Sequence, residues 1–130
     1  MNTIILITAV IAIVLIIMFL KSSKQSAGTL LNPETFKQKI DDTPGVVIDV
    51  RTKAEYDNGH LKITKFNYDV MNGQFEAKLD SLDKNDTYYL YCRSGNRSGK
   101  AVQMMKNNGF ENAFNIGSFN SLVNSGVETE

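Results

Sequence analysis

The stretch YLYCRSGNRSGKAV, residues 89–102, contains the only cysteine of the 130-residue chain. An apolar and aromatic run ends at Cys92, and two arginines, two serines and two glycines follow within seven positions. Residues 98–108 then place Val102 and Met105 on one side, as a helix does. The stretch therefore predicts a buried strand at residues 88–91, a tight loop and a helix.

The run VVIDV, residues 46–50, has β-branched side chains at four of its five positions, which is typical of a strand buried on both faces. Further strands are predicted at residues 29–31, 65–70 and 113–116. Helices are predicted between the strands, at residues 32–41, 52–58, 73–82 and 98–108. This alternation predicts an α/β fold: a central, mainly parallel sheet of four to five strands with helices on both faces.

The residues after Cys92 have the composition of an anion-binding loop. Ligands of such sheets bind beyond the carboxyl ends of the strands, and Cys92 lies at such an end. A thiolate at the mouth of a helix is stabilised by the helix dipole and by free backbone N–H groups. Arg93 and Arg97 add positive charge. Ser94 and Ser98 add hydroxyl donors, and the glycines let the backbone curl around a bound group.

The plainer interpretation of Cys92 is a small buried side chain that only fills space at a strand end. That interpretation does not explain why two arginines, two glycines and two serines occupy the next seven positions. We therefore predict that Cys92 is a reactive thiol with a lowered pKa, able to hold a charged group bonded to its sulfur.

The motif Cys92-Arg93-Ser94-Gly95-Asn96-Arg97-Ser98 resembles the active-site loop of single-domain rhodaneses, which are sulfurtransferases. Two further segments, in the same chain order as in that family, extend the resemblance over about residues 29–126. They are Asp49-Val50-Arg51 with Glu55-Tyr56 and Gly59-His60-Leu61, and later Asn108-Gly109-Phe110 with residues 113–117. The chain departs from the family pattern at Lys62-Ile63-Thr64, Gly117-Ser118 and Leu122.

The resemblance implies that Cys92 takes sulfur from thiosulfate or a persulfide and passes it to a thiol or cyanide, without metal or organic cofactor. It implies that residues 93–98 bind the substrate, and Arg97 is the residue expected to contact its anionic group. Asp49 and Arg51, at the end of another strand, are expected to support the loop structurally. His60 is expected to shape a turn rather than act as a base.

Two other functions stay open. The domain can be a sulfur relay or binding module whose acceptor is a protein partner. It can also be a small phosphatase or arsenate reductase, although cysteine phosphatases separate Cys and Arg by five residues and here Cys92 and Arg97 are separated by four. Lysine plus arginine and aspartate plus glutamate both total 14, which argues against general nucleic-acid binding.

Residues 3–20, TIILITAVIAIVLIIMFL, carry no charge. Eighteen helical residues reach roughly 27 Å, close to the hydrocarbon thickness of a bilayer. We predict a single-pass membrane anchor, or uncleaved signal, at residues 1–21, with a cleaved signal peptide as the rival. A linker is predicted at residues 22–28 and the α/β domain at residues 29–130. The lysines at positions 21 and 24 favour a cytoplasmic domain, and the periplasmic side stays open.

Overall fold

The computed structural model describes residues 2–22 and 30–130. A four-stranded parallel sheet forms the centre of the second range, as the sequence predicts, with the order β2-β1-β3-β4. The strands are β1 (Val46–Asp49), β2 (Thr64–Asn67), β3 (Tyr88–Cys92) and β4 (Ala113–Ser118). The predicted strand at residues 29–31 is reduced to an isolated bridge between Leu30 and Asn115, and residue 29 lies outside the described residues.

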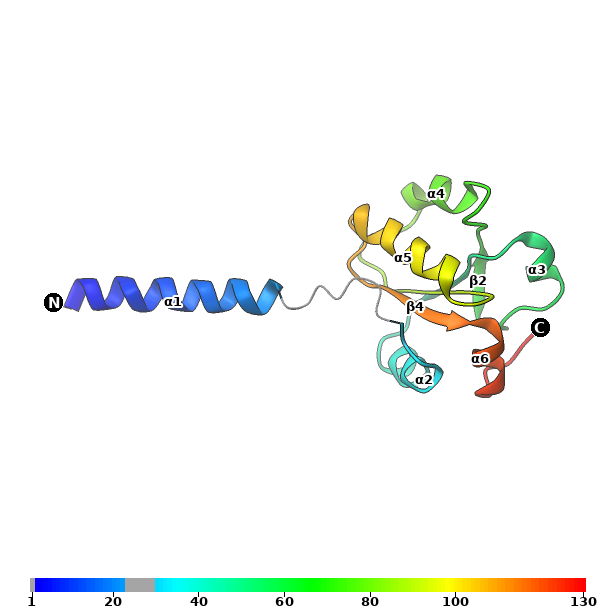
Figure 1. The fold of residues 1–130 in the computed structure, drawn as a ribbon, viewed down its shortest axis with the longest axis horizontal. Coiled ribbons are helices and arrows are strands. Elements are labelled where there is room, and N and C mark those ends of the chain that lie inside the picture. The colour runs from blue at the N-terminus through cyan, green and yellow to red at the C-terminus, as the bar shows by residue number, and fades with distance from the viewer. Residues whose placement is uncertain (1, 23–29) are drawn as a thin grey trace.

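Helices cover both faces of the sheet, as expected for parallel strands (Figure 1). They are α2 (Pro33–Asp42), α3 (Lys53–Asp57), α4 (Gln74–Lys78), the 3₁₀ turn η1 (Leu79–Ser81), α5 (Asn96–Asn107) and α6 (Phe119–Asn124). Asn32 caps α2 through a 2.8 Å bond from the backbone N–H of Thr35, and a capping box at Thr52 begins α3.

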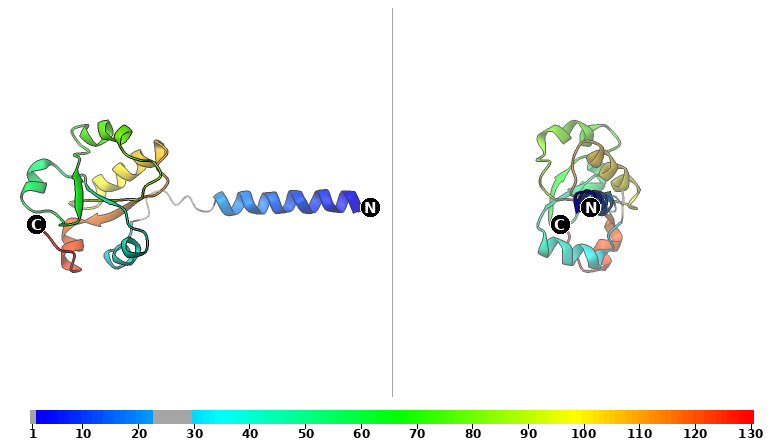
Figure 2. Two further views of the ribbon diagram at one scale, coloured as in Figure 1. Left: turned by 180° about the vertical axis from the view of Figure 1, so that it is seen from behind. Right: turned by 90° about the vertical axis from the view of Figure 1, so that its left-hand side faces the viewer.

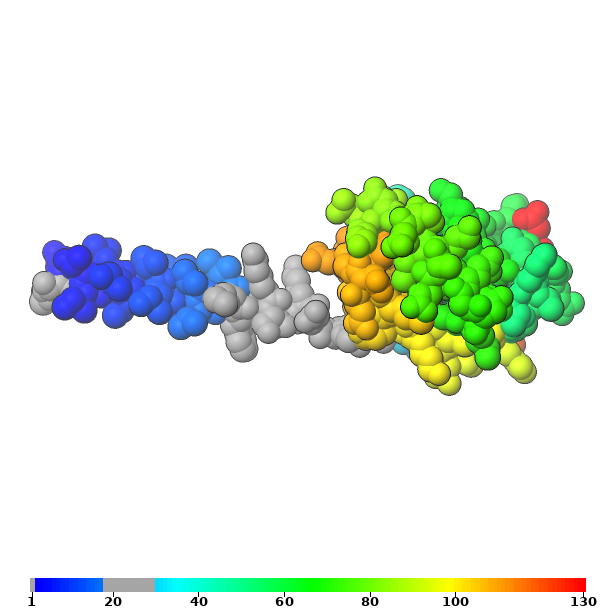
Figure 3. All heavy atoms as spheres, turned by 90° about the horizontal axis from the view of Figure 1, so that it is seen from above, coloured from blue at the N-terminus to red at the C-terminus, as the bar shows by residue number. Residues whose placement is uncertain are grey.

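The core has two halves, one on each face of the sheet, and Figure 2 shows the two helical layers from behind and end on. Successive residues of β1 serve different halves because side chains alternate along a strand. Ile48 packs in the half beneath α4 and α5, and Val47 packs in the half beneath α2 and α6. In Figure 3 the green part of the chain that includes α4 and the yellow part that includes α5 lie side by side on one face of the molecule.

Helix α1 (Asn2–Ser22) forms over the apolar N-terminal run. No helix among the described residues is both long and apolar enough to cross a bilayer, so the structure does not support the predicted transmembrane helix at residues 3–20. Residues 23–28 of the predicted linker lie outside the described residues.

Candidate active site

The loop between β3 and α5 carries Cys92 at the carboxyl end of the sheet. Cys92 is the last residue of β3 and is fully buried, and its strand partner in β4 is Ser118. Gly95 adopts φ = 91°, a left-handed conformation that favours glycine, and reverses the chain so that α5 begins at Asn96. Helix α5 therefore begins two residues before the predicted position, inside the motif.

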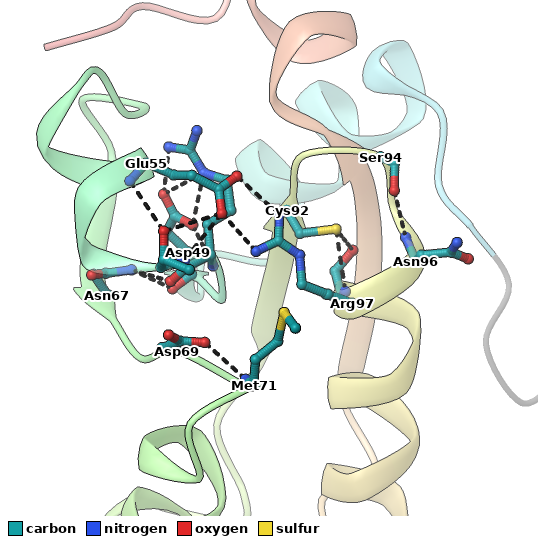
Figure 4. Close-up of polar contacts among 12 residues, drawn as sticks. Asp49, Glu55, Asn67, Asp69, Met71, Cys92, Ser94, Asn96 and Arg97 are labelled. Atoms are coloured by element: carbon teal, nitrogen blue, oxygen red, sulfur yellow. Dashed lines mark hydrogen bonds and ion pairs between the residues drawn. The ribbon is translucent and has the colours of Figure 1, made fainter.

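Three hydrogen bonds converge on the Cys92 sulfur, and Figure 4 shows Cys92 at the end of its strand with Arg97 beside it. The backbone N–H of Gly95 lies 3.0 Å from Sγ, the N–H of Ser98 lies 3.4 Å away, and the Ser98 hydroxyl lies 3.3 Å away. Burial by itself raises the pKa of the Cys92 thiol. The hydrogen bonds from Ser98, together with backbone N–H groups of Ser94 and Gly95, outweigh burial and lower that pKa below its ordinary value.

Arg97 is held by an acidic residue from another element. Its guanidinium nitrogens donate to the two carboxylate oxygens of Glu55 at 2.7 and 2.9 Å, and the pair is partly buried. These bonds lower the pKa of Glu55 to about 2, against the opposing effect of its burial. The observed contact of Arg97 therefore ties the loop to α3, and contact with an anionic substrate stays a prediction.

The remaining loop residues face solvent. Arg93, Ser94 and Asn96 are exposed. Arg93 lines a pocket of about 320 Å³ whose other walls come from β1, α3 and α6: Arg51, Glu55, Asn58, Gly59, Phe119 and Asn120. The pocket thus adjoins the loop and offers the exposed guanidinium of Arg93 to a ligand.

Asp49 and Arg51 form a buried ion pair at the end of β1. Arg51 donates from its side chain and its backbone to the Asp49 carboxylate at 2.7 to 3.0 Å, and it also donates to the carbonyl of Gly59 at 2.8 Å. The guanidinium carbon lies 4.5 Å from the ring centre of Phe119. Arg51 thereby connects β1, the turn at Gly59 and α6.

His60 lies in a turn and stacks on Tyr56, with 3.7 Å between the ring centres. Its Nδ1 is 3.0 Å from the Tyr56 carbonyl oxygen, and its backbone pairs with Glu130. These contacts hold the ring and the backbone of His60 within the turn, and its role in shaping the turn stays a prediction.

Two residues at the site were not singled out by the sequence: Glu55 as the partner of Arg97, and Asn115. Asn115 is buried in β4 and hydrogen-bonds the carbonyl of Gly95 and the hydroxyl of Ser98. The signal that points to it is a polar amide inside the apolar strand segment AFNIG, because buried polar groups need partners.

The geometry agrees with comparisons to known proteins. The model of the rhodanese-like domain matches residues 32–125. The chain belongs to the rhodanese-like family. YrkF of Bacillus subtilis (strain 168), named as a candidate sulfur carrier protein, is 32% identical over 97 residues, which are 72% of this chain and 51% of YrkF. The tRNA uridine(34) hydroxylase of Yersinia enterocolitica is 32% identical over 70% of this chain and 27% of that enzyme.

Solved structures share the fold. A crystal structure from Staphylococcus saprophyticus has 31% identity and a TM-score of 0.64, and the match covers 76% of this chain and 97% of that one. A rhodanese-like domain protein from Staphylococcus aureus has 28% identity and a TM-score of 0.64, covering 77% and 96%. By contrast, the chain spans only about half of YrkF and about a quarter of the hydroxylase.

Proposed function

We propose that this rhodanese-like domain is a sulfurtransferase that carries sulfane sulfur on Cys92. The observation that carries the proposal is the convergence of three hydrogen-bond donors on one buried sulfur at the end of β3. Donors of this kind stabilise the thiolate, which is the nucleophilic form. They also favour negative charge on a second sulfur bonded to the first.

The reaction has two half-reactions. The Cys92 thiolate attacks the outer sulfur of thiosulfate, the S–S bond of thiosulfate breaks, and sulfite leaves with the electron pair. The Cys92 persulfide that results is then attacked at its outer sulfur by an acceptor thiolate or by cyanide. Cys92 leaves as the thiolate, and the product is a new persulfide or thiocyanate. This is covalent catalysis with an external acceptor, because the chain has no second cysteine.

A sulfur relay that discharges only onto a protein partner is the second candidate. The similarity to YrkF, a named candidate sulfur carrier, favours it. Loading the full chain with thiosulfate and then offering cyanide, a small thiol or a cell extract separates the two functions. Discharge to cyanide or the small thiol supports the enzyme, and discharge to extract proteins alone supports the relay.

Phosphate or arsenate chemistry has less support from the site. A phosphoryl group carries up to two negative charges and binds best where arginine charge is free. Here Cys92 and Arg97 are separated by four residues, not by the five of cysteine phosphatases, and the charge of Arg97 is already paired with Glu55. Phosphate-ester hydrolysis that depends on Cys92 would revive this alternative.

Attachment to a membrane through residues 3–20, with the domain on the cytoplasmic or periplasmic side, remains a prediction from the sequence. Every large apolar side chain described in α1 is exposed, among them Ile4 and Ile11. Sedimentation of the full chain with membranes, and its extraction by detergent but not by high salt, tests this prediction. A full chain recovered in the supernatant contradicts it.

A further inference from the structure

The Ser98 hydroxyl has two acceptors and one proton. Its oxygen lies 3.3 Å from the Cys92 sulfur and 2.7 Å from the Asn115 Oδ1. A serine hydroxyl donates one hydrogen bond at a time. The sulfur and the amide oxygen therefore compete for the same proton, and the shorter contact is with Asn115.

The orientation of the Asn115 amide is fixed by its other contacts. Its Nδ2 donates to the carbonyl of Gly95 at 3.0 Å, and its Oδ1 accepts from the backbone N–H of Gly117 at 3.0 Å. A carbonyl only accepts and a backbone N–H only donates, so a flipped amide loses both bonds. The oxygen that faces Ser98 is thus an acceptor.

The backbone on both sides of the Asn115 amide leaves space for it. The β3–β4 register shifts by one residue between the Leu90–Asn115 and Tyr91–Gly117 pairs, so the regular ladder is interrupted beside the amide. On the α5 side Gly99 has no side chain, and a Cβ there would lie 3.3 Å from Nδ2. Ser98 is fully buried and Asn115 is 6% exposed, so water does not readily replace either partner.

We infer that Asn115 is a positioning residue for Cys92 chemistry, which sets the direction of the Ser98 hydroxyl according to the state of the sulfur. In the thiol form the S–H donates to the Ser98 oxygen, and Ser98 donates to Asn115. In the thiolate form the hydroxyl turns and donates to sulfur. The same turn serves the second half-reaction, when the persulfide S–S bond breaks and its electron pair returns to the Cys92 sulfur.

The inference rests on the proposed role of Cys92 as nucleophile, but its test needs no sulfur donor. Rates of alkylation by iodoacetamide between pH 5 and 10 report the thiol pKa, since only the thiolate reacts. Arg97 is a charged group that interacts with the Cys92 sulfur, Glu55 and Asp69 interact in turn with Arg97, and all three remain in every variant. If the variants load sulfur normally but their alkylation profiles do not differ as expected, the role of Asn115 is rejected and the proposed function is unaffected.

The experiment is a double-mutant cycle in the full chain, kept in mild detergent, with Ser98→Ala, Asn115→Leu and the double variant. Removing Ser98 is expected to raise the thiol pKa more in the Asn115→Leu background than in the parent, by on the order of one pH unit. In the Asn115→Leu background the Ser98 hydroxyl no longer has the amide oxygen as a second acceptor. Its removal therefore raises the thiol pKa by more than it does in the parent. Effects of a loosened loop cancel in the cycle.

Circular dichroism checks whether Asn115→Leu folds. If it does not, Asn115→Asp with and without Ser98→Ala provides a second comparison. Asn115→Asp keeps the acceptor and strengthens it, so Ser98→Ala is expected to raise the thiol pKa less in this background than in the parent. Equal shifts from Ser98→Ala in all folded backgrounds would overturn the inference and leave Asn115 with a purely structural role.

Discussion

Both carboxylate oxygens of Glu55 accept hydrogen bonds from the guanidinium of Arg97, at 2.7 and 2.9 Å. Glu55 is also the third residue of α3, where its side chain completes the capping box with Thr52. One carboxylate thus stabilises the start of α3 and joins the Cys92 loop to that helix. Glu55 lies four residues after Arg51, in the segment that resembles the first family motif. This segment therefore contacts the Cys92 loop through the ion pair between Glu55 and Arg97.

The Glu55–Arg97 pair makes stability depend on pH at the acidic end. The pKa of Glu55 in the folded chain, about 2, is below its ordinary value of 4.5. A carboxyl group whose pKa is lower in the folded than in the unfolded chain stabilises the fold at pH values above its unfolded pKa. This contribution is lost as pH falls from about 4.5 to about 2. Chemical denaturation of the parent and Glu55→Gln is expected to show a difference in unfolding free energy at pH 7 that shrinks toward pH 2. A difference independent of pH would contradict the account.

The Ser98 hydroxyl is expected to lower the pKa of the Cys92 thiol. Ser98→Ala removes one of three donors, so the midpoint of the alkylation-rate profile moves to higher pH than in the parent. Ser94→Ala is the matched control, because the Ser94 hydroxyl is exposed and contacts only the backbone N–H of Asn96, at 3.5 Å. Equal midpoints for the parent and Ser98→Ala would show that the backbone N–H groups alone set the thiol pKa.

The buried Asp49–Arg51 pair is expected to matter for stability more than any exposed pair. Arg51→Leu leaves the Asp49 carboxylate buried without its partner and is expected to cost about 3–5 kcal/mol of unfolding free energy. Lys53→Leu breaks the exposed pair with Asp57 and is expected to cost less than about 1 kcal/mol. Urea denaturation compares them, and similar losses for both variants would argue against a structural role for Arg51.

Gly95 is expected to affect both stability and reactivity. At φ = 91° an alanine is strained, so Gly95→Ala costs about 1–2 kcal/mol and displaces the N–H that donates to sulfur. Gly73→Ala, at φ = 84° with open space around it, carries similar strain far from the loop. Both variants lose stability in denaturation, but only Gly95→Ala slows alkylation of Cys92 at pH 7. Slowing in both would mean that reactivity follows global stability.

The sequence predicts the fold well because its signals are local. The β-branched run at residues 46–50 and the strand–loop–helix pattern around Cys92 specify buried parallel strands, and β1, β3 and α5 appear at those places. The strand predicted at residues 29–31 appears only as an isolated bridge, because a strand forms only where a neighbouring strand pairs with it over several residues. Leu30 meets β4 at a single bridge to Asn115.

The site could be predicted only in part. Cys92 and its loop are contiguous in the sequence, so their composition alone indicates an anion-binding loop. The partners of the loop come from other elements: Glu55 is 42 residues from Arg97, and Asn115 is 17 residues from Ser98. Which charge pairs with which residue follows from the packing of α3 and β4 against the loop, and no local pattern encodes that.

The most direct test of the central claim is the intact mass of the reduced full chain after incubation with thiosulfate, beside Cys92→Ser. The account predicts that the parent gains one sulfur atom, that cyanide removes it as thiocyanate, and that Cys92→Ser gains none. A parent that takes up no sulfur from thiosulfate or from a persulfide donor would contradict the account.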